Sequence, residues 1–371
     1  MDLCGKDDVK KRNREQGRRN GPLIDKLIIN KNGIRIKIYM CLKNILNKLL
    51  SKRANAMDNQ NNTNTTPKLK VVAYIDLLAM SNFVRENVTD SIAVFSGYDY
   101  ILQTKIRDAK IQPASSEKDP KLKILLERTA VSAFDYFLPF SDSIFLASSN
   151  PDKFIEQLGH YILSCYLYNA EAYNDKTLNP SKPFMNKMLG LDGNIYEHNV
   201  YPILFRGGLC IGDIAEGRVL GRINGTNQQM PVLIGEPVVN AVKMESVVKG
   251  PRVVLDEDSF QQLEPTSKQY IRKTEVDKYY EVLWPAYHFI ESNGKGELHK
   301  FDELFDLAVN LWKVFNHTQF STHYFALLGL ITASTLAFAQ KIGCLNEAVQ
   351  FIEKKLETHE LSSKKDVLLK K

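Results

Sequence analysis

A run of strand-forming residues, VVAYIDLLAMSNF (71–83), contains a single carboxylate, Asp76. Val, Ile and Tyr favour strands, so the apolar residues KVVAYIDLL (70–78) predict a buried strand. An ionised carboxylate in such apolar surroundings is costly unless it is paired, hydrogen-bonded or bound to a metal. Asp76 therefore needs a partner from elsewhere in the chain, or it merely ends a strand.

The residues after this strand alternate between helix and strand patterns. Two strands around a tight turn are predicted for 130–148, because PFSDS supplies turn residues between two apolar runs. A helix is predicted for 151–173, with Pro near its start and apolar residues at helical spacing. The later predictions are strands at 201–214, 231–235 and 251–257 and a helix at 236–248. This order predicts an α+β fold whose first part has a ferredoxin-like split βαβ layout, with an antiparallel-rich sheet flanked by helices.

Charge and composition divide the chain into three parts. Residues 1–70 hold 17 Lys and Arg against 6 Asp and Glu, a balance of +11, so the rest of the chain carries −5 of the net +6. We therefore expect a basic leader and linker (1–67), an α+β domain (68–290) and a helical C-terminal extension (291–371). Because the basic residues belong to the leader, no nucleic-acid polymer is expected as a partner.

The leader leaves two questions open. Its segment IRIKIYMCLKNILNKLL (34–50) is apolar with interspersed lysines, a pattern typical of an amphipathic helix on a membrane surface or on a partner. We favour a loosely folded leader without membrane association. Met57, just before the polar linker, is an alternative natural start.

The cysteines and the longest apolar stretch indicate a cytoplasmic protein. The 5 cysteines are scattered and never spaced as C-x-x-C, which argues against a disulfide framework or a zinc–thiolate site. The first 20 residues lack the apolar region of a signal peptide. Residues 324–339 are uncharged but too few to span a bilayer, and we interpret them as a buried helix.

The predicted layout brings a second carboxylate to Asp76. The strand at 70–78 lies beside the central hairpin, so Asp142 in the turn of that hairpin comes close to Asp76. Two carboxylates on adjacent strands can hold one or two divalent ions that bind a nucleoside triphosphate. LLAMSNF (77–83) leads into a helix start with Ser81 as the candidate cap, where free N–H groups can receive phosphates.

Four motifs between residues 70 and 258 together resemble class III nucleotidyl cyclases. They occur in the order of that family: YIDLLAMS, FSDSIFL, FRGGLCIG, and IGEPVVNAVKMES followed by PRVVLDE. The resemblance implies two Mn²⁺ or Mg²⁺ ions per active site, held by Asp76, Asp142 and the backbone carbonyl of Leu77. It implies a triphosphate contact for Arg206. It also implies a homodimer with active sites at the interface, with 68–290 as the cyclase domain.

The helix at 236–248 departs from the family in one of its two transition-state residues. The family places an Asn there and an Arg four residues later. Aligned on Gly235, these positions hold Val239 and Lys243. Lys243 supplies positive charge, whereas Val239 cannot replace the Asn, although Asn240 is adjacent. Glu236 and Glu245 are interpreted as a helix-start charge and a surface charge.

A second departure concerns the base. Purine cyclases of the family read the base with a Lys and an Asp, and the corresponding positions here are Leu138 and Val232. Neither side chain can hydrogen-bond a purine edge. The pattern resembles the bacterial anti-phage pyrimidine cyclases (the Pycsar family), which make cyclic UMP or cyclic CMP. Uridylate cyclase is our first choice, because most of the family that this pattern resembles is assigned that activity. Cytidylate cyclase is the alternative, because no residue here reads uracil over cytosine.

Two other functions remain open at this point. A catalytically inactive cyclase-like module would bind nucleotide without turnover, and Val239 favours it mildly. A polymerase-palm or diguanylate-type enzyme shares a related strand layout, but the chain lacks a hairpin like G-G-D-E-F.

Overall fold

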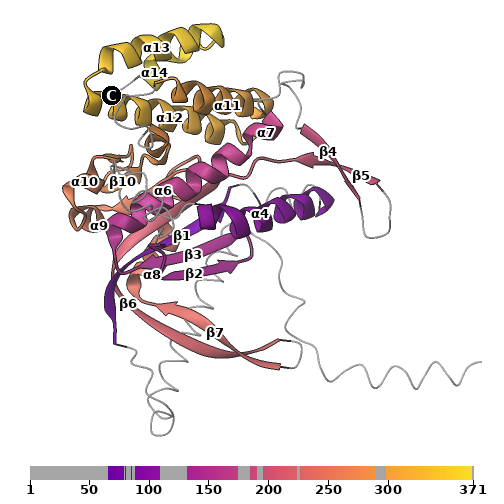
Figure 1. Cartoon of the computed structure of the whole chain (residues 1–371), viewed down its shortest axis with the longest axis vertical. Helices are drawn as coiled ribbons and strands as arrows, with labels where there is room; N and C mark the ends of the chain where they lie inside the picture. Colours follow the sequence, from indigo (N-terminus) through magenta and orange to yellow (C-terminus); the bar gives the residue numbers. More distant parts are fainter. Residues whose placement is uncertain are drawn as a thin grey trace, which may run out of the picture. The chain divides into compact units, whose positions relative to one another are not determined.

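The computed structural model describes residues 66–78, 80, 85, 88–108, 132–173, 184–189, 195–223, 226–289 and 298–369 (Figure 1). Contacts divide the chain into residues 1–64 and 65–371, and all described residues belong to the second part. The segment 34–50 and Ser81 lie outside the described residues, so what we predict for them stays a prediction.

One sheet organises the described part of the chain. Its strands run in the order β2-β3-β1-β6-β8-β10-β9, and β7 pairs with β6. All these pairs are antiparallel except β6 with β8. The strands are β1 (Lys68–Leu77), β2 (Tyr136–Phe140), β3 (Ser143–Ser148), β6 (Phe205–Ile223), β7 (Thr226–Ile234), β8 (Val253–Asp256), β9 (Ile271–Lys273) and β10 (Tyr279–Val282). The order β2-β3-β1-β6 is that of a split βαβ unit, so the predicted α+β layout is confirmed.

Helices cover the sheet and form the C-terminal part. They are α4 (Val88–Asp108), α6 (Pro151–Tyr168), α7 (Ala170–Tyr173), α8 (Glu236–Met244), α9 (Glu257–Gln261), α10 (Pro265–Lys268), η1 (Trp284–Phe289), α11 (Lys300–Phe315), α12 (Ser321–Ile342), α13 (Leu345–Thr358), η2 (Ser362–Lys364) and α14 (Lys365–Leu368). The orange and yellow helices α11 to α13 lie beyond α6, on the side of the sheet away from β7 (Figure 1).

Strand β1 is buried on both faces, which explains its nearly continuous apolar sequence. Val71, Ala73 and Ile75 belong to a hydrophobic cluster with α4, α6 and the C-terminal helices. Val72 and Tyr74 point to the opposite face and pack in a second cluster with residues of α8. Asp76 follows the alternation of Val72 and Tyr74, so its side chain lies on the α8 face.

The predicted helix 151–173 is divided in two at Asn169. It begins as expected, with Pro151 in its first turn and the Asn150 side chain accepting the N–H of Lys153 (3.0 Å). The Asn169 side-chain amide donates to the carbonyl of Ile203 (3.0 Å) and accepts the N–H of Ile203 (2.8 Å). This side chain ties the end of α6 to the residues that enter β6.

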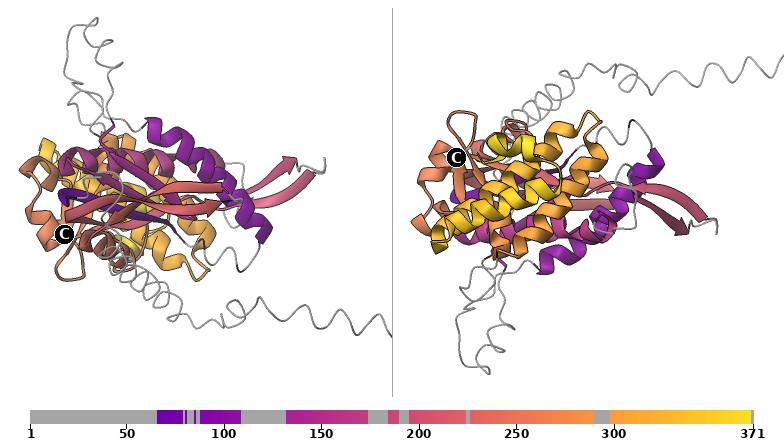
Figure 2. Two further views of the ribbon diagram at one scale, coloured as in Figure 1. Left: turned by 90° about the horizontal axis from the view of Figure 1, so that it is seen from below. Right: turned by 90° about the horizontal axis from the view of Figure 1, so that it is seen from above.

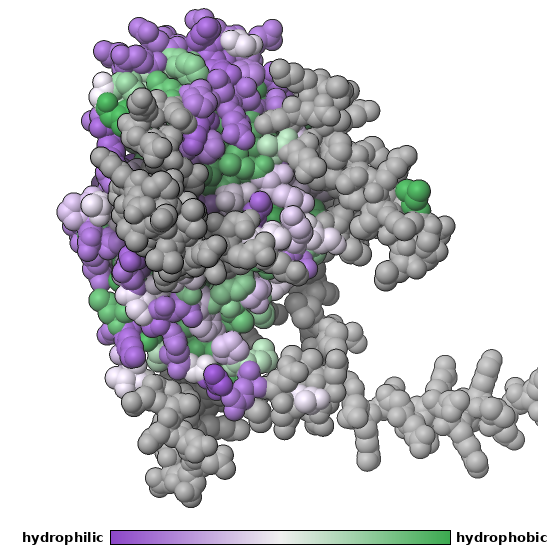
Figure 3. Space-filling model, in the orientation of Figure 1, coloured by the Kyte–Doolittle hydropathy of each residue, from purple (hydrophilic) through white to green (hydrophobic). Residues whose placement is uncertain are grey.

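The uncharged stretch 324–339 lies within α12, where most of its apolar side chains are buried as predicted and the others are half-buried. By length and composition α12 could cross a membrane, but 56% of its most apolar window is buried inside the protein. Figure 2 (right) shows the yellow helices lying over the other elements. Hydrophilic side chains gather at the top of Figure 3, where α13 buries only one side, through Ala348, Ile352 and Leu356.

Other features also differ from the sequence prediction. Strand β6 runs to Ile223 instead of ending at residue 214, because β7 pairs with it as far as Ile223–Thr226 and satisfies its backbone. The strands β4 (Phe184–Leu189) and β5 (Ile195–Val200) form a separate hairpin between α7 and β6. The mixed polar and apolar residues of these segments give only a weak strand pattern.

Candidate active site

The end of β1 places Asp76 between two neighbouring strands. In the sheet register Asp76 lies opposite Ser143 of β3 and opposite Arg206 of β6. The carboxylate is mostly buried, with 16% of the side chain exposed. Asp76 is therefore at the carboxyl end of a central strand, where rigid neighbours fix its direction.

The structure brings Asp142 next to Asp76. Asp142 is half-buried in the two-residue turn between β2 and β3, where Ser141 has φ 57°. The N–H of Leu77 donates to the backbone carbonyl of Asp142 (2.9 Å). Leu77 is itself buried in the core. This bond holds the hairpin turn against the end of β1 and keeps the two carboxylates together.

A chain of hydroxyl groups orients the Asp76 carboxylate. Ser143 Oγ donates to Asp76 Oδ1 (2.9 Å), and the Tyr74 hydroxyl is 2.7 Å from Ser143 Oγ. Since Ser143 uses its only proton on Asp76, the Tyr74 hydroxyl donates to Ser143. Burial, followed by the charge of Asp76, raises the pKa of Tyr74 far above its ordinary range, so Tyr74 stays a donor.

The site holds more negative charge than its own groups neutralise. Burial, together with the nearby carboxylates of Glu245 and Asp142, raises the pKa of Asp76 from 3.8 to about 7. Arg206 and the Ser143 hydrogen bond act in the opposite direction but do not cancel these effects. A buried carboxylate with this excess of negative charge favours either a proton or a metal cation.

Arg206 lies between two carboxylates. Its Nη2 is 3.4 Å from Asp76 Oδ2 and makes a closer ion pair with Glu245. Glu245 is only 6% exposed, so its interpretation as a surface charge is wrong. It immediately follows α8, whose packing on the sheet turns this position inward. The sequence signal was weak, because Glu245 stands between an apolar residue, Met244, and a polar residue, Ser246.

Glycines let α8 pack directly on β6. A Cβ at Gly208 would lie 2.1 Å from the Ala241 carbonyl oxygen and 2.7 Å from Met244 Cβ. A Cβ at Gly212 would lie 2.7 Å from Pro237 Cγ. The glycines of FRGGLCIG therefore set the height of α8 above the sheet, and with it the position of Glu245.

The loop between α8 and β8 is held by the C-terminal part of the chain. The N–H of Gly250 donates to His323 Nδ1 of α12 (3.0 Å), and Trp284 Nε1 donates to the Pro251 carbonyl (2.9 Å). The Arg252 carbonyl accepts the N–H of Gly207, next to Arg206 (2.9 Å). Burial, with the nearby Arg206, lowers the pKa of His323 to about 4, so its ring is a neutral acceptor at pH 7.

The remaining predicted residues lie on α8, β2 and β7. Lys243 is exposed in the last turn of α8, one turn after the half-buried Val239. Leu138 lies on β2 opposite Phe145, and Val232 lies on β7 opposite Gly217. Ser81 is outside the described residues. Glu236 is exposed in the first turn of α8, as expected of a helix-start charge.

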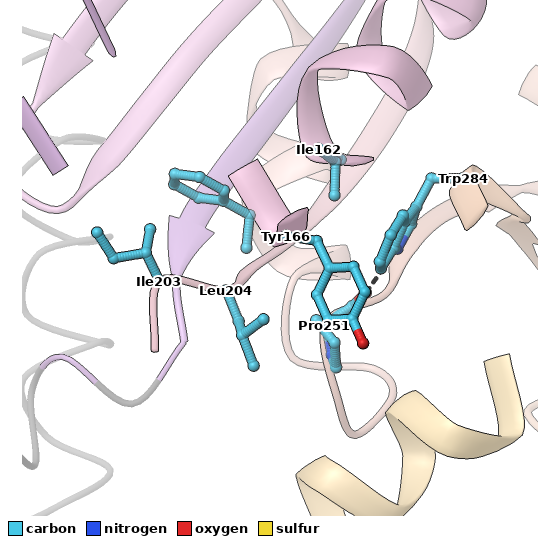
Figure 4. A pocket seen from close by; sticks show the side chains of 7 residues that line it. Ile162, Tyr166, Ile203, Leu204, Pro251 and Trp284 are labelled. Carbon is cyan, nitrogen blue, oxygen red and sulfur yellow. Dashed lines mark hydrogen bonds between the residues drawn. The ribbon is translucent and has the colours of Figure 1, made fainter. Parts of the chain in front are cut away.

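An apolar hollow lies where the chain enters β6 (Figure 4). The residues around it are Ile162, Tyr166, Ile203, Leu204, Phe205, Pro251 and Trp284. The space between them is too narrow for a water molecule. The hollow is therefore core packing on the α6 side of the sheet, whereas Asp76 points to the α8 side.

The donor atoms of the site suit Mg²⁺ or Mn²⁺. Asp76, Asp142 and the Leu77 carbonyl would supply hard oxygen ligands, and the pKa of Asp76 is raised by burial and by the neighbouring carboxylates. Among the described residues, no group of three or more His, Cys, Asp and Glu could hold one ion. A cation here would therefore complete its coordination with water or substrate oxygens, as Mg²⁺ commonly does.

Metal affinity is expected to depend on pH through Asp76. Below pH 7 a proton competes for this carboxylate, whose pKa is about 7, so the apparent Kd for Mn²⁺ should fall about tenfold between pH 6 and pH 8. Titration of the nucleotide-free protein with Mn²⁺, followed by the electron paramagnetic resonance signal of free Mn²⁺, measures this. An affinity independent of pH over that range would contradict the buried position of Asp76.

Comparisons with known proteins give likeness only at the level of structure. No family model and no curated protein matches the chain. The guanylyl cyclase Cya2 aligns with 58% of this chain and 92% of its own, at 12% identity and TM-score 0.37. The adenylyl cyclase CyaB from P. aeruginosa aligns over 58% and 94%, at 12% identity and TM-score 0.33.

A third similar structure is the dimeric guanylyl cyclase domain of the RhoGC fusion protein from Blastocladiella emersonii. It aligns with 58% of this chain and 96% of its own, at 15% identity and TM-score 0.33. With TM-scores this low, the function of the chain has to be inferred from the residues of the site.

Proposed function

We propose that this chain is a cytoplasmic pyrimidine nucleotide cyclase that converts UTP to 3′,5′-cyclic UMP and pyrophosphate, as a second messenger in anti-phage defence. The observation that carries the proposal is the pairing of Asp76 with Asp142 at the end of the central strand, where the pKa of Asp76 is raised to about 7. The four motifs that resemble class III nucleotidyl cyclases support the same reaction, and cytidylate cyclase is the alternative activity.

The reaction is an intramolecular phosphoryl transfer. The ribose 3′-oxygen forms a bond to the α-phosphorus while the bond from that phosphorus to the pyrophosphate oxygen breaks, and the 3′-hydroxyl proton is lost. Divalent cations, when bound, make the 3′-hydroxyl more acidic and neutralise the leaving group. Asp76, Asp142 and the Leu77 carbonyl would hold these ions, with Asp76 oriented by Ser143.

Arg206 is the residue best placed to contact the triphosphate. Its guanidinium lies beside Asp76, and its buried Nε finds no hydrogen-bond partner among the described residues. A buried donor without an acceptor is costly, and a phosphate oxygen would satisfy it. The charge of Arg206 would then stabilise the negative charge of the transition state.

The preference for a pyrimidine rests on what two positions lack. Leu138 and Val232 are half-buried on different hairpins and carry no hydrogen-bonding atoms in their side chains. A pocket built from such residues gives a purine edge no donor or acceptor, which removes the usual basis for selecting adenine or guanine.

A homodimer would bring α8 of one subunit to the carboxylates of the other. Val242 of α8 is 39% exposed, although it is apolar, and Lys243 beside it is also exposed. An exposed apolar position next to a cation suits an interface that meets the charged nucleotide. In this arrangement Lys243 would stabilise the transition state in the partner's site.

One assay tests the proposal. Purified protein with Mn²⁺ is incubated separately with UTP, CTP, ATP and GTP, and the products are separated by chromatography. We expect cyclic pyrimidine nucleotide and pyrophosphate, with at least about tenfold lower rates for the purines. Preferential conversion of ATP or GTP would overturn the base argument. Linear or dinucleotide products would instead favour a polymerase-type enzyme.

A catalytically inactive nucleotide-binding module is the second candidate. Val239 favours it, because an apolar side chain replaces the family's transition-state Asn one turn before Lys243. Binding of a triphosphate without turnover of any of the four would support this second function.

A further inference from the structure

Glu245 is a buried charge that the proposed reaction does not use. It is 6% exposed and follows the last turn of α8, over the sheet face that carries Asp76. Its carboxylate pairs with Arg206, which also faces Asp76. Burying a carboxylate is costly, so its burial calls for an explanation, and the ion pair with Arg206 suggests one.

The two carboxylates compete for one guanidinium. Arg206 Nη2 is 3.4 Å from Asp76 Oδ2, a long contact, whereas its pair with Glu245 is the closer one. A guanidinium seated fully on Asp76 would neutralise that carboxylate and repel a divalent cation. Because Arg206 pairs more closely with Glu245, the charge of Asp76 is only partly neutralised.

We propose that Glu245 is a positioning residue that draws Arg206 away from Asp76, so that Asp76 stays available to a divalent cation. The inference rests on the proposed function, because it concerns the same metal site. Arg206 held in this way keeps its Nε unpaired and ready for a phosphate oxygen. Glu245 thereby keeps Asp76, which would bind the cation, apart from Arg206, which would bind the phosphates of the substrate.

Rigid neighbours keep Glu245 in place. Close packing at Gly208 fixes the end of α8, since Met244, the residue before Glu245, would contact any Cβ there at 2.7 Å. The following loop is anchored at Gly250 by His323 and at Arg252 by the N–H of Gly207. Both partners of the ion pair are therefore attached to the same rigid unit of strand and loop.

A double-mutant cycle on Mn²⁺ binding tests this role without measuring activity. The proteins are the wild type, Glu245→Gln, Arg206→Gln and the double variant, each titrated with Mn²⁺ at pH 8 without nucleotide. We expect Glu245→Gln to weaken Mn²⁺ binding about tenfold, because Arg206 then seats on Asp76. The double variant should return to within about threefold of the wild type, since no guanidinium competes. Glu245→Asp, with a shorter side chain, should be intermediate.

Each other outcome has a defined meaning. Unchanged binding in Glu245→Gln overturns the inference, and so does an equally weak double variant, which would show that Glu245 acts on the cation directly. If Glu245→Gln does not fold, Arg206→Gln decides: tighter binding than in the wild type supports the inference, and weaker binding overturns it. If Asp76→Asn binds Mn²⁺ as tightly as the wild type does, the proposed metal site itself is overturned, and the inference with it.

Discussion

The variant Asp76→Asn is expected to lose cyclic-nucleotide formation by about 10³-fold or more, because it removes one of the two carboxylates that hold the cations. Asn has nearly the same shape as Asp and still accepts the hydrogen bond that Ser143 donates, so the strand register should survive. Product formation from UTP and CTP with Mn²⁺ measures the effect. The exposed Asp213 of β6 offers a matched control, and Asp213→Asn should retain activity.

The same variant should be more stable than the wild type when no metal is present. The pKa of Asp76 rises on folding from 3.8 to about 7, so between these values the folded state binds more protons than the unfolded state. Stability of the wild type therefore falls as pH rises from about 4 to about 7, and Asp76→Asn escapes this loss.

At pH 8 with a chelator we expect the free energy of unfolding of Asp76→Asn to exceed that of the wild type by about 1–3 kcal/mol. At pH 4 the difference should be small, because Asp76 is then protonated in the folded wild type. Urea denaturation at both pH values measures it. A variant less stable than the wild type at pH 8 would contradict the uncompensated charge of this site.

Gly208→Ala is expected to destabilise the protein by about 2–3 kcal/mol and to abolish activity. The added Cβ meets the backbone of α8, 2.1 Å from the Ala241 carbonyl oxygen, so the helix has to move away from the sheet. That movement also displaces Glu245. Urea denaturation and the nucleotide assay measure the two effects.

The same strand supplies a control for this substitution. At Gly217 a Cβ would meet only side chains, those of Val232 at 3.3 Å and Ile234 at 3.9 Å, and these can adjust. Gly217→Ala should therefore change the free energy of unfolding by less than about 1 kcal/mol. Similar effects of the two substitutions would show that the close packing of α8 on β6 does not depend on Gly208.

Local patterns predicted the main elements because their causes are local. Pro151 and the Asn150 cap begin α6 without help from the rest of the chain. The turn residues of PFSDS predicted the hairpin that presents Asp142. The division of the helix at Asn169 escaped prediction, because it depends on bonds to Ile203, 34 residues further along the chain.

The carboxylate pair was predictable, but its surroundings were not. Asp76 and Asp142 follow from a strand and a turn that each have a clear pattern, and the split βαβ layout puts them side by side. Glu245 was interpreted as a surface charge, but it is buried. Its burial depends on how closely α8 approaches β6, which the contact at Gly208 decides.

By itself the sequence determined the α+β class, the central hairpin and the identity of the two carboxylates, because strand propensity, turn chemistry and helical spacing act over a few residues. The tertiary structure alone decided that Arg206 is shared between Asp76 and Glu245, and that α12 supports the loop after α8 through His323. These contacts join residues that are 39 to 130 positions apart. Such contacts follow from the packing of whole elements against one another, and no local pattern records them.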